Sequence, residues 1–166
     1  MNVYPETVSD GFGIRLAVYF SGCSHRCPGC HNPQSWSPHS GRILDGAFAG
    51  EIIARILGNP LLDGVTFSGG DPMFNPGEFL AFLSRLKRET GLGVWCYTGY
   101  VYEDLLRDPL RCECLKHIDV LVDGPFVEAL ADPRLYFRGS SNQRIIELKN
   151  GRMERVLEPE REGWGA

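Results

Sequence analysis

The sequence lacks a long apolar run and carries little net charge. No hydrophobic stretch approaches the roughly 18 residues that a membrane helix requires, so we expect no membrane span. The net charge of −4 argues against nucleic acid as a main partner, because proteins that bind it carry a basic surface. Residues 1–13 contain neither a basic start nor an apolar signal core, so we expect a cytoplasmic protein.

The densest cysteine cluster lacks a fourth member. Cys23, Cys27 and Cys30 fall within eight residues of one another, and the other three of the six cysteines lie far along the chain. A closed ferredoxin-type cluster needs four cysteines, typically close in sequence. In a reducing cytoplasm, clustered thiols indicate a metal-binding or catalytic site and not a disulfide framework. The sequence therefore predicts a metal site with an incomplete set of protein ligands.

Short β-rich runs alternate with helical patterns along the chain. Strands are predicted at 14–20, 64–67, 93–97, 118–122 and 144–149, and helices at 46–57, 76–90, 101–107 and 109–116. This alternation predicts an α/β fold with a parallel sheet. Five strands are too few to close an eight-stranded barrel, so we expect an open, partial βα barrel of about five to six parallel strands. We expect residues 1–166 to form one domain, with a core over about 5–150 and a loose tail over 151–166.

Unusual loops follow four of the predicted strands. The cysteine run follows the first strand, and "SGGDP", "YTGY" and "DGPF" follow the next three. In open parallel sheets, ligands bind at the carboxyl ends of the strands. The sequence therefore predicts that these four loops meet at one functional edge of the sheet.

The cysteine run has the spacing C-x3-C-x2-C. Thiolates are soft ligands that suit either zinc or an iron–sulfur cluster. Three thiolates on a cluster of four irons leave one iron open to an outside ligand, as a catalytic zinc site leaves one position open. His25 and His31 lie in and beside the run, so a mixed Cys/His zinc site stands as the alternative.

This spacing, with a histidine directly after the last cysteine, resembles the radical S-adenosylmethionine enzymes. The resemblance implies that Cys23, Cys27 and Cys30 hold a [4Fe–4S] cluster, and that S-adenosylmethionine chelates the fourth iron through its amino and carboxylate groups. "SGGDP" resembles the glycine-rich strand end that contacts the methionyl amino group in that superfamily. The positions that the resemblance places at the cofactor are Gly29, Cys30, His31, Ser68, Gly69, Gly70, Asp71, Thr98 and Asp123.

Several of these positions have an ordinary structural interpretation as well. Asp71 sits where a helix could start, and Asp123 precedes a glycine as turn aspartates do. The polar run "RGSSNQR" over 138–144 fits either a contact to cofactor or partner, or a solvated loop. Cys96 reads as a small core residue, and the "CEC" of 112–114 as incidental cysteines at a helix end.

Further segments resemble the activases of glycyl radical enzymes. "DGFGIR" and "CHNPQSW" fit that group, although Phe12 replaces a proline of its pattern. "YTGY", "VLVDGPF" and "RGSSNQR" are similar to the small activating proteins of anaerobic (class III) ribonucleoside-triphosphate reductase.

The resemblance implies a function and two protein partners. It implies reductive cleavage of S-adenosylmethionine to a 5′-deoxyadenosyl radical, which abstracts hydrogen from a glycine of that reductase. It also implies a flavodoxin-like reductant. The alternatives are activation of another glycyl radical enzyme, such as pyruvate formate-lyase, and a non-catalytic iron–sulfur or zinc protein.

Overall fold

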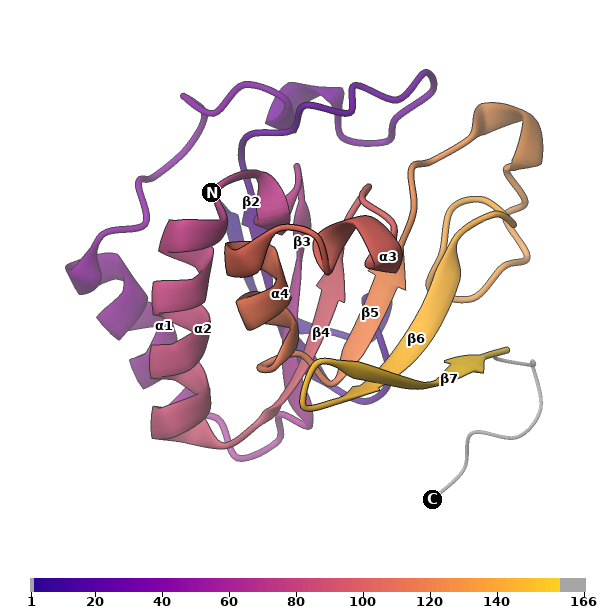
Figure 1. The fold of residues 1–166 in the computed structure, drawn as a ribbon. Coiled ribbons are helices and arrows are strands. Elements are labelled where there is room, and N and C mark those ends of the chain that lie inside the picture. Colours follow the sequence, from indigo (N-terminus) through magenta and orange to yellow (C-terminus); the bar gives the residue numbers. More distant parts are fainter. Residues whose placement is uncertain (1, 159–166) are drawn as a thin grey trace.

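Four parallel strands form the centre of the sheet in the computed structural model, which describes residues 2–158 (Figure 1). They are β2 (Arg15–Phe20), β3 (Gly64–Gly69), β4 (Gly93–Tyr97) and β5 (Val120–Asp123). Each pairs with the next in chain order, so their carboxyl ends share one edge of the sheet. The loops that follow these strands gather at the top of Figure 1.

Three antiparallel strands complete the sheet, so that its spatial order runs from β1 to β7. They are β1 (Asn2–Thr7), which pairs with β2, and β6 (Arg144–Lys149) and β7 (Arg152–Leu157), which extend the sheet beyond β5. The α/β prediction is confirmed, but the expectation of five to six parallel strands is wrong. The segment between β5 and β6 contains only the short helix η3 (Glu128–Leu130) and no crossover helix. The chain therefore re-enters the sheet from the edge it left, and β6 runs antiparallel.

The expectation of a loose tail from residue 151 is corrected for residues 152–157, which form β7. Asn150 and Gly151 connect β6 to β7 with φ values of 51° and 77°. A two-residue Asn-Gly loop with positive φ at both positions is the favoured turn of a β-hairpin. The remainder of the predicted tail, 159–166, lies outside the described residues.

The helices begin and end largely where the sequence predicts. They are α1 (Gly46–Leu57), α2 (Pro76–Thr90), α3 (Tyr102–Leu105) and α4 (Pro109–Leu115), with the short 3-10 helices η1 (Pro33–Ser35) and η2 (Pro72–Phe74). The Asp45 carboxylate accepts a hydrogen bond from Phe48 N and caps α1. Gly91 ends α2 in the left-handed conformation. Asn75 precedes α2, but its side chain makes no capping hydrogen bond.

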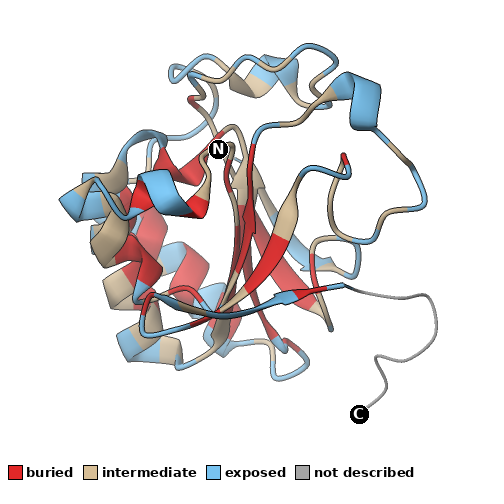
Figure 2. Cartoon of the chain, turned by 45° about the vertical axis from the view of Figure 1, so that its right-hand side comes forward, coloured by how far each residue is buried: buried red, intermediate tan, exposed pale blue. Residues whose placement is uncertain are grey.

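The main hydrophobic core lies between the helices and one face of the sheet (Figure 2). Phe67 and Phe79 pack edge to face within it, and Ile52, Leu83 and Leu86 from the helices are fully buried. Burying each such side chain contributes about 1.5–3 kcal/mol. Among the described residues, no helix is both long and apolar enough to cross a membrane.

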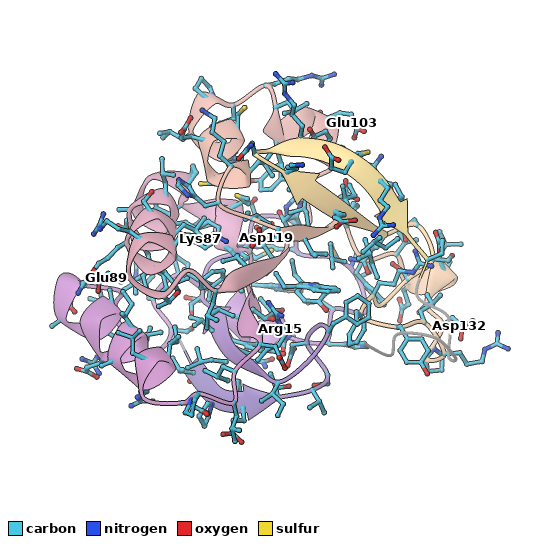
Figure 3. The ribbon with its side chains drawn as sticks, turned by 90° about the horizontal axis from the view of Figure 1, so that it is seen from below. Arg15, Lys87, Glu89, Glu103, Asp119 and Asp132 are labelled. Carbon is cyan, nitrogen blue, oxygen red and sulfur yellow. The ribbon has the colours of Figure 1, made fainter. Side chains whose placement is uncertain are left out.

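The other face of the sheet carries a smaller cluster around Trp95 and a buried arginine. Arg15 is 6% exposed and lies among the strands near the middle of the molecule (Figure 3). Its guanidinium donates to Thr66 Oγ1 at 2.7 Å and to the carbonyl oxygens of Val65 and Gly93 at 2.8 and 3.1 Å. Burial lowers the pKa of Arg15 to about 10. This side chain joins β2 to both β3 and β4 at their amino ends.

Replacement of Arg15 by lysine should destabilise the fold. A lysine keeps the charge but cannot reproduce the planar set of donors, so two strand carbonyls lose their partner. We expect Arg15→Lys to lower the free energy of unfolding by about 2 kcal/mol, measured by urea denaturation. The matched control is Arg107→Lys, whose side chain is 79% exposed and which should unfold as the wild type does. Equal unfolding midpoints for the two variants would contradict this role of Arg15.

Candidate metal and cofactor site

Backbone hydrogen bonds join the cysteine loop to the carboxyl end of β3. Gly70 N donates to Phe20 O and Asp71 N donates to Gly22 O, both at 2.8 Å. Gly22 N in turn donates to Ser35 O at 2.8 Å. This hydrogen bond joins the last part of the loop to its first residues. The "SGGDP" turn therefore continues the pairing of β2 and β3 into the cysteine loop and fixes its first residues.

The two glycines of "SGGDP" permit this close approach. A Cβ at Gly70 would lie 2.6 Å from Gly22 O, and a Cβ at Gly69 would lie 2.6 Å from Phe20 N. Gly69 also has a φ of 97°, a conformation that side chains disfavour. Both glycines are thus required for loop packing, whatever further contact they make.

The three cysteines line one cavity of about 180 Å³ at this edge of the sheet. Of the other predicted cofactor residues, the cavity is also lined by His31, Ser68, Gly69, Gly70 and Thr98. Four loops that are distant in sequence therefore meet here, as the positions after the strands predicted.

The three thiols of this cavity are free and half-buried. Burial raises the pKa of Cys23 above its ordinary value, which disfavours its thiolate form unless a cation lies nearby. Asn32 N donates to Cys30 Sγ at 3.4 Å, an N–H···S contact of the kind that tunes iron–sulfur clusters.

A single metal ion makes a different demand from a cluster. Within residues 2–158, no three His, Cys, Asp or Glu side chains are arranged to hold one metal ion. A cluster of four irons takes each thiolate on its own iron, so the three sulfur atoms need to line one cavity and not to meet at a point. Three thiols in one cavity wall fit that demand.

Asp71 does not line the cavity but lies buried behind it, 2% exposed. Its carboxylate accepts hydrogen bonds from Met73 N at 2.8 Å, Thr98 Oγ1 at 3.0 Å and Gly99 N at 3.0 Å. The Nε2 atom of His25 also lies 3.0 Å from Asp71 Oδ2. The capping bond to Met73 N is the ordinary role considered for this residue, and the other contacts were not predicted.

Asp123 does not line the cavity either and is 1% exposed. Its carboxylate accepts from Tyr102 N at 2.7 Å and pairs with the guanidinium of Arg144. Hydrogen bonds to Asp123 and then to Glu103 raise the pKa of Arg144 above its ordinary value. Asp123 thus connects β5, α3 and β6. Its contacts in the structure are with these neighbouring elements.

The segment after β5 closes the far side of the cavity. Gly29, which has a φ of 71°, would bring a Cβ to 2.8 Å from the side chain of Glu128. The rings of His31 and Phe126 lie 5.5 Å apart. The cysteine loop therefore packs directly against the 124–143 segment, and Gly29 serves this contact.

The polar run 138–144 mainly holds its own segment together. Gln143 accepts from Gly139 N and donates to Gly124 O, while Asn142 donates to Pro125 O. Gln143 and Gly139 also line the cavity. Sequence reasoning left open whether these residues face a cofactor or solvent, and the structure places two of them at the site.

Several cavity residues were missed by the sequence analysis. They are Asn32, Tyr97, Gly99, Gly124 and Phe126. All lie within or beside the quoted loops, but none carries a charge or a metal-binding group. Their place at the end of β4 or in the loops that follow β2, β4 and β5 was the only signal that could have identified them.

The comparisons with known proteins agree with this geometry. The family described as a 4Fe-4S single cluster domain matches residues 9–146, well over half of the chain. A protein of Haemophilus influenzae named anaerobic ribonucleoside-triphosphate reductase-activating protein is 39% identical over 153 residues, which cover 90% of this chain and 97% of that protein. This chain belongs to that family of activating proteins.

Other members of the activating-protein family match over a similar length. The protein of Escherichia coli K12 with the same name is 37% identical over 150 residues, which cover 88% of this chain and 96% of that protein. The one of bacteriophage T4 is 33% identical over 152 residues, which cover 90% and 94% respectively. The family match over residues 9–146 includes the cysteine loop, strands β2 to β5 and the segment after β5.

The remaining cysteines differ in accessibility from the site cysteines. Cys96 and Cys114 are fully buried, and burial raises the pKa of Cys114 to about 12 and that of Cys96 well above its ordinary value. At about pH 8 under anaerobic conditions, iodoacetamide should modify the cluster-free protein at Cys112 and the loop cysteines but not at Cys96 or Cys114. Peptide mass spectrometry before and after denaturation measures this. Native modification of Cys114 as fast as that of Cys112 would contradict the buried position.

Proposed function

We propose that this protein activates an anaerobic ribonucleoside-triphosphate reductase by radical chemistry that starts from S-adenosylmethionine. The observation that carries the proposal is the cavity in which three thiols meet the glycine-rich end of β3 without a fourth thiol among its described lining residues. The names of the related proteins support the same target. The sheet then acts as a partial βα barrel of the radical S-adenosylmethionine type, with β2 to β5 as its parallel part.

Cys23, Cys27 and Cys30 would hold the [4Fe–4S] cluster in this proposal. When bound, the cluster would supply the electron that cleaves S-adenosylmethionine, and the three cysteines would leave it one position for that molecule. The protein's own part is to bind, orient and shield. Ser68, Gly69, Gly70 and Gln143 line the space where the methionyl end would lie.

The proposed reaction is balanced in atoms and electrons. One electron enters the sulfonium and breaks the bond between sulfur and the 5′ carbon, giving methionine and a 5′-deoxyadenosyl radical. That radical takes one hydrogen atom from the α-carbon of a glycine in the reductase. The products are 5′-deoxyadenosine and a glycyl radical on the partner. None of these steps needs a general acid or base from this chain.

The position of the cavity suits a protein substrate. Its lining residues come from the cysteine loop, the strand ends and the 124–143 segment, and these segments lie together at one edge of the sheet (Figure 1). A loop of a second protein can therefore approach from outside. We propose a flavodoxin-like protein as the reductant, because the electron must come one at a time and at low potential. We also propose a reducing cytoplasm as the compartment, in which the six free cysteines stay reduced.

Loss of one cysteine in the loop should remove the cluster, whereas loss of Cys112 should not. After anaerobic reconstitution, we expect Cys27→Ala to retain little iron and to yield no detectable 5′-deoxyadenosine when reduced with S-adenosylmethionine. Cys112→Ala should retain the iron content and the 5′-deoxyadenosine yield of the wild type, because it lies on α4. Iron analysis and chromatography measure the two quantities. Equal losses in the two variants would mean that the ligands are misassigned.

The proposed target is tested by the radical that the reaction leaves behind. The reduced, reconstituted protein is mixed with S-adenosylmethionine and an anaerobic ribonucleoside-triphosphate reductase, and the sample is frozen for EPR. We expect a glycyl-radical doublet that is absent when the reductase glycine is replaced by alanine. A doublet on pyruvate formate-lyase but not on the reductase would favour the alternative activase. If S-adenosylmethionine leaves the cluster EPR spectrum unchanged and no 5′-deoxyadenosine forms, the proposed cleavage of S-adenosylmethionine is excluded.

A further inference from the structure

His25 points inward from the cysteine loop, although it lies between two cluster cysteines. Its side chain is 19% exposed, and its Nε2 atom lies 3.0 Å from Oδ2 of Asp71, whose side chain is 1% exposed. Nε2 is itself buried and has no partner of standard hydrogen-bond geometry among the described residues. The Asp71 carboxylate is therefore the polar group that this buried nitrogen faces.

The ring of His25 lies in a slot after β4 that is formed by Gly99 and Tyr100. A Cβ at Gly99 would lie 2.5 Å from His25 Cδ2, so a side chain there would displace the ring. Tyr100 packs edge to face on the ring with centroids 4.5 Å apart. The guanidinium of Arg111 lies 4.3 Å from the Tyr100 ring and donates to its hydroxyl at 3.1 Å. The slot is thus supported from α4 as well as from β4.

Asp71 contacts each segment that surrounds the slot. Its backbone N–H binds Gly22 O at the start of the cysteine loop, and its carboxylate binds Thr98 and Gly99 after β4. Through His25 it reaches the middle of the same loop. One residue therefore holds the loop at two points and fixes both points to the ends of β3 and β4.

We propose that the His25–Asp71 pair is a tether that holds the cysteine loop in its ligating conformation, with both residues acting as positioning residues for the cluster. His25 lines the cavity, whereas Asp71 does not, so Asp71 acts through the loop and not by contact with a cofactor. The inference rests on the proposed function only in taking Cys23, Cys27 and Cys30 as the ligands. The tether is formed by the protein itself, so it is present in the cluster-free protein.

The experiment measures how fast the loop thiols react with a disulfide reagent, 5,5′-dithiobis(2-nitrobenzoate), in the cluster-free protein without oxygen. A Cys112→Ser background leaves only the loop thiols accessible, since Cys96 and Cys114 are buried. His25→Leu removes the N–H but keeps an apolar side chain, and we expect about tenfold faster thiol reaction. His25→Gln keeps an amide N–H that can reach Asp71, and its rate should stay within about threefold of the His25 protein. His39→Leu, at an exposed position, should react as the parent does.

Asp71→Asn completes a double-mutant cycle with His25→Leu. A tether predicts that the double variant reacts no faster than the faster single variant. Additive effects, an unchanged rate in His25→Leu, or equal rates in His25→Leu and His25→Gln would each overturn the proposal. Where Asp71→Asn fails to fold, the comparison of leucine with glutamine at position 25 still decides.

A second measurement follows the reconstituted protein. Iron loss to the chelator bathophenanthroline should also be about tenfold faster in His25→Leu than in His25→Gln, and equal rates of iron loss would count against the tether. The proposed function is judged separately, by 5′-deoxyadenosine from the wild type. If the wild type yields none, that function fails while the thiol rates still decide the tether.

Discussion

One buried carboxylate determines how the functional edge of the sheet is assembled. Asp71 must find donors because an unpaired polar group in the interior is costly. Its carboxylate accepts hydrogen bonds within its own turn and from residues after β4, and it faces Nε2 of His25 in the cysteine loop at 3.0 Å. The position of the cysteine loop therefore depends on the same residue that follows β3.

The amino ends of the same strands are fixed by the opposite charge. Arg15 begins β2 and binds carbonyl oxygens of β3 and β4, whereas Asp71 follows β3 and binds groups after β4. Strands β3 and β4 are thus joined by a side chain at each end. Strand β2 is joined to β3 by Arg15 at its amino end and by backbone hydrogen bonds of Gly70 and Asp71 at its carboxyl end. Arg15 belongs to the motif "DGFGIR" and Asp71 to "SGGDP". Each motif therefore contributes one of the two residues that join neighbouring strands.

Much of the fold could be predicted because its signals are local. Asp45 and Gly91 bound their helices, and apolar runs marked the four parallel strands. Strand β1 was missed because its residues are largely exposed and carry a proline, so no alternating pattern identifies it. The roles of Asp71 and Asp123 could not be predicted either. An aspartate after a strand has the same local signature whether it faces a ligand or a buried partner, and here that depends on His25 and Arg144 from distant segments.

The cavity is lined mainly by uncharged residues, so charged residues in the sequence identify little of it. Among its described lining residues there is no carboxylate, and five are glycines: Gly69, Gly70, Gly99, Gly124 and Gly139. Glycine exposes backbone N–H and C=O groups, which can bind a zwitterionic methionyl group without a charged side chain. In the proposed function the protein then needs its cysteines for the cluster and its backbone for the cosubstrate. Asp71 and Asp123, the two carboxylates that the sequence analysis named, do not line the cavity. They bind backbone N–H groups of neighbouring segments and so hold those segments together.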